Sequence, residues 1–504
     1  MSKTSIAQRL CNPSLTLYAY HLRTDINNGP DQPSDDADQL WKSLVKLGCD
    51  LQIPELQNLK QQLVCYQNGQ YAPEAENLLK LKRQNLLNLQ KESLNFQLIA
   101  PKGDKDLQLD GFLCPFLIHD TYAVDLTLLF NGSISLDQLR QFNPKKRLLP
   151  PYIQASLGQT LLLYGELIEP CNEDEVLKLA NDCVVQLLGT QNRFELDGDS
   201  KLLDNQIYEY ETLERDPSKR CRILVWLINP KTPIIENLEL VATYLLELLC
   251  PYHKILYAYD QAQWCQRQAE EISSFVDKFS QNFLNITSKD RLYEFKNFKE
   301  LLPDLYKKTL EYSRYIRDLV DHESTITINI RNYESRFNKL CELGKSTNND
   351  LSFFRDFIAL THDKYKSQIQ FSRQHLESGS KLIDTVMAMV TIERAELEAA
   401  IEAAAKEREE AAQDREKRLG ILITLLGTSL AFSSISVELI KPSEKFPFLK
   451  LCKSDFVCSF PFDMFFHFII GFIFAIIVGG FIYLLLKTFP KLKKALIRSL
   501  LIKE

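Results

Sequence analysis

The 504-residue sequence has little of the residues that define several protein classes. Its 17 Gly and 20 Pro are too few for collagen or for a low-complexity chain. Its 12 Cys are too sparse for a disulfide scaffold, and ten of them lack CxxC or His-paired spacing, as is typical of reduced cytosolic thiols. The 60 Lys and Arg against 66 Asp and Glu leave a net charge of −6, so no nucleic-acid partner is expected.

Catalytic and targeting motifs are also missing from the sequence. The N-terminus has no apolar core of about 7–15 residues, so we expect no cleavable signal peptide. Residues 344–347 read GKST, but position 339 is Lys339, where a phosphate-binding loop needs its first glycine. His322-Glu323 lacks the second His of a zinc-binding helix, because position 326 is Ile326. We expect a protein that is not an enzyme and uses no cofactor, and the sequence leaves metal binding open.

Two long uncharged runs lie near the C-terminus. Residues 419–437 form 19 positions without a charge, and residues 464–486 form 23 positions with His467 as the only readily titratable group. A helix of about 20 apolar residues can cross a bilayer, so the runs predict a transmembrane hairpin at 419–487 with a loop at 438–463. Two buried core helices are the alternative, and it is stronger for the first, more polar run.

The distribution of Lys and Arg predicts the orientation of this hairpin. Five basic residues precede the first run, six follow the second, and the loop holds four. Because basic flanks stay inside, we expect both termini and the basic tail 488–504 in the cytoplasm and the loop outside. Cys452 and Cys458 lie in that loop, where thiols can oxidise, so a disulfide is expected, with two independent thiols as the alternative.

The rest of the chain divides near residue 255 into an N-terminal part with mixed signals and a helical part. Helices are predicted at 36–47 and 173–188. Strands are predicted from runs rich in Leu, Tyr, Phe and Val at 15–22, 112–118, 122–130, 161–168, 207–212 and 223–228. The fold class is therefore α+β: residues 1–255 form a cytoplasmic, sensor-like α/β domain of unread strand order, and a helical stalk follows at 256–418.

The stalk is expected to contain helices at 261–283, 304–319, 325–343 and 351–418. If continuous, the last would be 68 residues and roughly 100 Å long, and it would run directly into the first uncharged run. Its apolar heptad seam, typical of a coiled coil, weakens toward that run, and 15 of the 28 residues at 391–418 are charged. Two interpretations stay open: an exposed single helix laced with ion pairs, or a stalk that lines an oligomeric funnel.

Small and hydroxylated residues share one face of the first uncharged run, away from Leu422, Leu425 and Phe432. These pore-lining candidates are Gly420, Thr424, Gly427, Thr428, Ala431 and Ser434. Such a stripe permits either close helix packing without a pore or a lining that contacts water. Arg415, Lys417 and Arg418, just before the run, are candidates for basic rings at the inner mouth of a pore.

This order of elements resembles the CorA family of divalent-cation channels, in which a cytoplasmic α/β domain leads into a long stalk helix, a pore helix, a second span and a basic tail. The family's Gly-Met-Asn signature is absent, and residues 433–437 read SSISV in its place. The resemblance implies a homo-oligomer, a pentamer in that family, in a bacterial inner membrane or plasma membrane, with the first span lining the pore. Some CorA-like proteins are membrane effectors of bacterial defence gated by a nucleotide messenger.

Two functional hypotheses follow. In the first, the protein is a homo-oligomeric membrane channel or pore, gated when its cytoplasmic domain binds an unknown ligand. In the second, the hairpin is only an anchor in the lipid bilayer, and the cytoplasmic part is a scaffold or sensor without transport activity.

Overall fold

The computed structural model of the protein describes residues 9–24, 33–73, 83–88, 91–99, 107–189, 194–212, 214, 216–232, 238–284, 291–344, 350–439 and 459–488. The chain forms two compact units, Met1–Val386 and Met387–Glu504. The domain limits expected at residues 255, 418 and 487 stay predictions.

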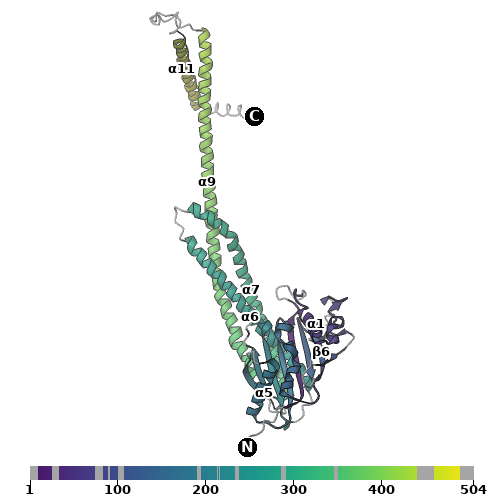
Figure 1. The fold of residues 1–504 in the computed structure, drawn as a ribbon. Helices are drawn as coiled ribbons and strands as arrows, with labels where there is room; N and C mark the ends of the chain where they lie inside the picture. The colour runs from purple at the N-terminus through teal and green to yellow at the C-terminus, as the bar shows by residue number, and fades with distance from the viewer. Residues whose placement is uncertain are drawn as a thin grey trace. The chain divides into compact units, whose positions relative to one another are not determined.

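A ten-stranded mixed sheet organises the first unit (Figure 1). Its strand order is β10-β11-β12-β9-β1-β7-β6-β4, with β5 paired to β6 and β8 paired to β1. Strand β12 runs parallel to β9, and the other pairs are antiparallel. The strands are β1 (Arg9–Leu22), β4 (Gln84–Asn85), β5 (Leu94–Ile99), β6 (Gln108–Ile118), β7 (Thr121–Leu129), β8 (Ser133–Ser135), β9 (Gly158–Leu167), β10 (Phe194–Leu202), β11 (Asn205–Thr212) and β12 (Cys221–Ile228). All six predicted strands are confirmed.

One face of the sheet is apolar. In β1, Leu15, Leu17 and Ala19 alternate toward a buried core, because successive strand residues point to opposite faces. Helices α1 (Gln39–Leu51) and α5 (Glu173–Leu188) contribute to this core, and both were predicted from the sequence. A capping box between Asn172 and Glu175 fixes the first turn of α5. The first unit also contains three short helices and a small hairpin. These are α2 (Pro54–Gln57), α3 (Leu59–Gln62), α4 (Pro150–Ile153) and the hairpin of β2 (Tyr66–Gln67) with β3 (Gln70–Tyr71).

The opposite face of the sheet carries aromatic and polar side chains and is bonded to a long helix. Helix α6 (Leu238–Leu284) accepts a hydrogen bond at the Leu246 carbonyl from Tyr20 Oη, 2.8 Å away. Thr160 Oγ1 of β9 lies 2.9 Å from His253 Nε2 of the same helix. Directed hydrogen bonds therefore attach α6 to this face, which also contains buried apolar residues such as Leu162 and Leu224.

Long helices follow the sheet. Helix α7 is continuous over Arg291–Leu343, where two helices were expected, so the predicted break near residue 320 is wrong. The predicted long helix at 351–418 is present as one helical run with a π-helical turn inside it: α8 (Ser352–Leu360) continues through η6 (Thr361–Lys366) into α9 (Ser367–Leu439), and the backbone is helical on both sides of the turn.

Within the first unit, α9 packs on α6 and α7 through side-chain hydrogen bonds. Tyr312 Oη donates to the Leu376 carbonyl at 2.8 Å, and Ser372 Oγ donates to Gln266 Oε1 at 2.6 Å. Arg373 donates to Glu323 at 2.7 Å. These contacts fix which face of α9 meets the other two helices.

The second unit contains the rest of α9 and helix α11 (Ser459–Thr488). Helices thus form over both uncharged runs. Among the residues that the structure describes, no helix combines the length and the apolar character needed to span a membrane. Most of the expected loop, residues 440–458, and the tail from residue 489 onward lie outside the described residues. An α+β fold with an N-terminal mixed sheet followed by long helices is therefore confirmed.

Candidate functional site

The predicted pore-lining stripe can be placed relative to α11. A Cβ atom at Gly479 of α11 would lie 3.4 Å from Leu425 Cδ2 of α9, so Leu425 faces α11. At about 100° per residue, Leu422 shares that side, whereas Gly420, Thr424 and Gly427 lie on the other. A Cβ at Gly420 or Gly427 would meet nothing within 4 Å. These three residues of the stripe therefore face away from α11, whereas Thr428, about 60° from Leu425, borders the α11 side.

The hydroxyl groups of this stripe bond within their own helix. Thr424 Oγ1 donates to the Gly420 carbonyl at 2.8 Å, and Thr428 Oγ1 donates to the Thr424 carbonyl at 2.9 Å. This arrangement satisfies each hydroxyl proton without a second helix. The oxygen lone pairs stay available as acceptors, which is the chemistry that a cation would require.

The remaining predicted site residues are placed only in part. Ala431 is exposed on α9, and the side chain of Ser434 lies outside the described residues. Arg415, Lys417 and Arg418 are exposed on α9. Cys452 and Cys458 lie outside the described residues, so their disulfide stays a prediction.

A buried charged cluster, which we call the Arg222 cluster, lies between the sheet and the helices of the first unit. Arg222 of β12 is 2% exposed and forms an ion pair with Glu209 of β11, which is 4% exposed. The Arg222 guanidinium carbon also lies 4.2 Å from the ring centre of Tyr252 in α6 and 5.4 Å from those of Phe353 and Phe354 in α8. A single cation thus connects two strands with two helices.

The electrostatics of the cluster follow from burial and from this ion pair. Burial disfavours the charge of Arg222, but Glu209, Tyr252 and Tyr333 together outweigh it and hold the pKa of Arg222 above its ordinary value. Neighbouring His253 has its pKa lowered to about 3, first by burial and then by Arg222, so its imidazole is neutral at physiological pH. Tyr252 donates its hydroxyl proton to Glu211, the next inward-facing residue of β11. The cluster therefore has the chemistry of a structural ion pair that is buried away from solvent.

The sequence contains a signal for this cluster. Arg222 is the one charged residue in the run 221–228, CRILVWLI, which is buried along its whole length. A charge inside a fully buried strand requires a partner of opposite sign. The sequence YEYE at 208–211 alternates, which places Glu209 and Glu211 on one face of a strand, but strand order is needed to bring them beside Arg222.

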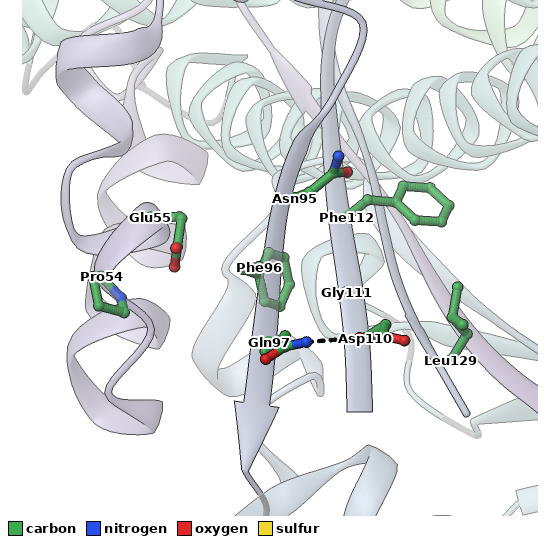
Figure 2. Close-up of a pocket in the computed structure, with 9 residues that line it drawn as sticks. All are labelled: Pro54, Glu55, Asn95, Phe96, Gln97, Asp110, Gly111, Phe112 and Leu129. Carbon is green, nitrogen blue, oxygen red and sulfur yellow. Dashed lines mark hydrogen bonds between the residues drawn. The ribbon is translucent and has the colours of Figure 1, made fainter. Parts of the chain in front are cut away.

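A separate pocket of about 630 Å³ opens at the β5 edge of the sheet (Figure 2). It is lined by Pro54, Glu55, Asn95, Phe96, Gln97, Asp110, Gly111, Phe112 and Leu129. Gln97 Nε2 donates to Asp110 Oδ1 at 3.3 Å across β5 and β6, as the dashed line shows. Asn95, Gln97 and Asp110 are exposed, so the pocket is open to solvent, and its lining combines polar side chains with apolar ones such as Phe96 and Leu129.

Comparison with known proteins gives no relative for this chain: neither the family models nor the curated proteins contain a match. The likeness to CorA channels is one of architecture, a mixed sheet domain followed by long helices. In the described part of the chain, no group of three or more His, Cys, Asp or Glu residues could hold a metal ion.

Proposed function

We propose that the protein is a homo-oligomeric membrane channel or pore whose N-terminal α+β unit controls opening. The observation that carries this proposal is the orientation of the α9 stripe. Gly420, Thr424 and Gly427 lie on the side of α9 opposite the α11 contact, where a Cβ at either glycine meets nothing. A copy of the same helix that approaches this side would find small residues that permit close packing.

The apolar surface of the second unit supports insertion of this unit into a bilayer. Leu419, Ile421, Leu422 and Ile423 are each at least 58% exposed, and α11 also exposes Phe and Ile residues. Exposed apolar patches of this kind mark membrane or protein contacts. The uncharged run 419–437 continues beyond the side chains that the structure describes, and its full length suits a span of about 20 residues.

The lining chemistry favours a polar pathway. Since the Thr424 and Thr428 protons are donated to helix carbonyls, their oxygens present lone pairs outward, as ligands that partly replace the water of a cation. Arg415, Lys417 and Arg418 would oppose cation entry, and Glu407, Glu409, Glu410, Asp414 and Glu416 on the same helix would offset them. We therefore propose no particular ion.

A membrane-anchored scaffold or sensor is the second candidate function. It is favoured by the Arg222 cluster, which ties the sheet to the helices without any open catalytic cleft at that place. An anchor would use α9 and α11 only to hold the sheet unit at the bilayer.

Cross-linking of single Cys replacements along α9 separates the two functions. In membranes that contain the full chain with its native Cys replaced, variants at Thr424, Gly427 and Ala431 should give intermolecular dimers and larger species. Variants at Leu422 and Leu425 should give at least tenfold less, because these positions face α11 of the same chain.

Ion flux from liposomes provides the functional readout. The full chain should release a trapped ion, and Gly427→Leu should block release because it fills the stripe. Leu422→Ala, a matched change on the α11 side, should leave flux intact. Equal cross-linking around α9, or cross-linking without flux, would leave only the anchor.

A further inference from the structure

Helices α7 and α9 of the first unit each expose two large apolar side chains. Phe371 of α9 is 72% exposed and Leu310 of α7 is 65% exposed, the two highest values for large apolar residues in the part of the first unit that the structure describes. Leu382 of α9 and Val320 of α7 are 49% and 38% exposed. Apolar side chains that gather on one face mark contact surfaces, whereas single exposed ones are ordinary.

The pair on α9 lies on one face of that helix, away from the other helices of the unit. Phe371 and Leu382 are 11 residues apart, close to three helical turns, so they share a face. The α9 residues that bond to α6 and α7 include Ser372 and Leu376, which are buried about 100° and about 140° around the helix from Phe371. The Phe371–Leu382 face therefore has no partner helix among these contacts.

The pair on α7 lies on the outer side of that helix and on its flank. Tyr312 and Glu323 point toward α9 of the same chain, as their hydrogen bonds show. Leu310 is about 160° around the helix from Tyr312 and so points the opposite way. Val320 is about 80° from both Leu310 and Tyr312, at the flank of the outer face.

The two pairs also correspond in height along the helices. The hydrogen bonds between α7 and α9 of one chain show that these helices run antiparallel. They place Leu310 at the height of Leu382 and Val320 at the height of Phe371, each within about one helical turn of 5.4 Å. A rotation about an axis along the helices changes the direction of a side chain but leaves its height unchanged. The α9 pair of one copy can therefore meet the α7 pair of a rotated copy in register.

We propose that the Phe371–Leu382 face of α9 packs on the Leu310–Val320 face of α7 in a neighbouring copy of this chain. A second copy is the occupant that the heights favour, because it offers two apolar side chains at the same spacing. Two different faces of the same chain meet in this contact, and contacts of that kind close into rings. The inference rests on the proposed homo-oligomer, whose copies all point one way, and adds a contact outside the stripe of the second unit.

Cross-linking between two differently tagged full-length chains tests the contact. Each chain has its native Cys replaced and carries one new Cys, and the two chains are co-expressed and treated with a short bifunctional thiol reagent. Phe371→Cys with Val320→Cys, and Leu382→Cys with Leu310→Cys, should give dimers that contain both tags. The swapped combinations use the same four side chains and should give at least tenfold less, because they differ in height by about 15 Å.

A charge on the proposed contact provides the second measurement. In the full chain, Phe371→Glu should lower the cross-link between Leu382→Cys and Leu310→Cys at least tenfold, because a carboxylate would be buried against an apolar surface. Val185→Glu is the matched control, since Val185 is 44% exposed on α5, and it should leave that cross-link unchanged. Both positions are exposed, so neither change should lower the thermal midpoint of the chain.

Several outcomes would overturn this contact. Swapped combinations that link as strongly as the matched ones would show that the heights do not decide it. Linkage of Phe371→Cys mainly to the same position of another chain would place two α9 faces together instead. Absence of the matched cross-links while Thr424→Cys chains still dimerise would reject the contact and leave the channel proposal intact. Loss of both kinds of cross-link would reject the homo-oligomer itself.

Discussion

The Arg222 cluster makes a sharp prediction about stability. Arg222→Met replaces the guanidinium by an apolar chain of similar length that still packs against Tyr252 and Phe354. It leaves the Glu209 carboxylate 4% exposed and without its cation. The perturbation therefore removes the charge partner and keeps most of the apolar packing.

The size of the effect follows from the burial of both partners. Removal of one member of a buried ion pair costs about 3–5 kcal/mol, mostly because the remaining charge stays desolvated. Replacement of both members by neutral groups is far less costly, so the double variant Arg222→Met with Glu209→Gln should recover at least about half of the loss. Non-additivity of about 2 kcal/mol or more is the expected signature of the pair.

Urea unfolding of the full chain, followed by tryptophan fluorescence, measures these differences. Trp226 is buried on the same strand as Arg222, and its indole donates to the Leu202 carbonyl at 3.2 Å, so it reports on the sheet. Lys219→Met is the matched control, since Lys219 pairs with Asp216 at the surface and its loss should leave the urea midpoint unchanged. Losses that add within about 0.5 kcal/mol would refute the reasoning, because the two charges would then not depend on each other.

Two further predictions concern the sheet. Burial raises the pKa of Asp125 to about 6, so ionisation of this carboxyl penalises the folded state as pH rises through that value. The free energy of unfolding of Asp125→Asn should therefore exceed that of the native chain by up to about 3 kcal/mol at pH 8 and by little at pH 3.5. A pH-independent difference in urea midpoints would contradict this. At Gly158, φ is +111° and a Cβ would lie 2.9 Å from the Pro217 carbonyl oxygen, so Gly158→Ala should lower the free energy of thermal unfolding by about 2–4 kcal/mol. Gly69→Ala is the control and should cost about 1 kcal/mol, because φ is +77° there and a Cβ meets nothing within 4 Å. Equal losses would show that the close approach at Gly158 is relieved without cost.

The strands were predictable because their signal is local. Runs such as 223–228 contain only large apolar side chains between turn residues, and these runs pair as strands whatever their order. The order itself was not predictable, because it depends on contacts such as Ile223 with Leu161, 62 positions apart in the chain. The Arg222 cluster could not be located for the same reason: Glu209 and Arg222 become neighbours only once β11 and β12 are known to pair.

The long helices show a different limit of sequence patterns. The expected helix at 351–418 contains no proline, and the pattern gave no reason to divide it. The structure keeps this helix continuous but inserts a π-helical turn at η6, where the residues THDKYK contain neither glycine nor proline. The π-turn is explained by packing: Tyr365 reaches Tyr259, and Ser372 reaches Gln266, only if one extra residue is accommodated between α8 and that contact. Tertiary contacts of this kind leave no local pattern.

The Arg222 cluster also fixes the helix that precedes η6. Phe357 of α8 packs on Tyr252 and Tyr333, with ring centres 4.5 and 5.2 Å away, and its carbonyl accepts the Thr361 hydroxyl at 2.7 Å. Displacement of α8 would move Phe353 and Phe354 away from the Arg222 guanidinium and would remove part of the packing around this buried charge. Helix α9 is anchored beyond the turn as well, because Ile369 and Leu376 are buried and the Tyr312 hydroxyl donates to the Leu376 carbonyl in a buried hydrogen bond. The π-turn therefore lies between two helical segments that are each fixed by their own buried contacts, and its extra residue accommodates both sets at once.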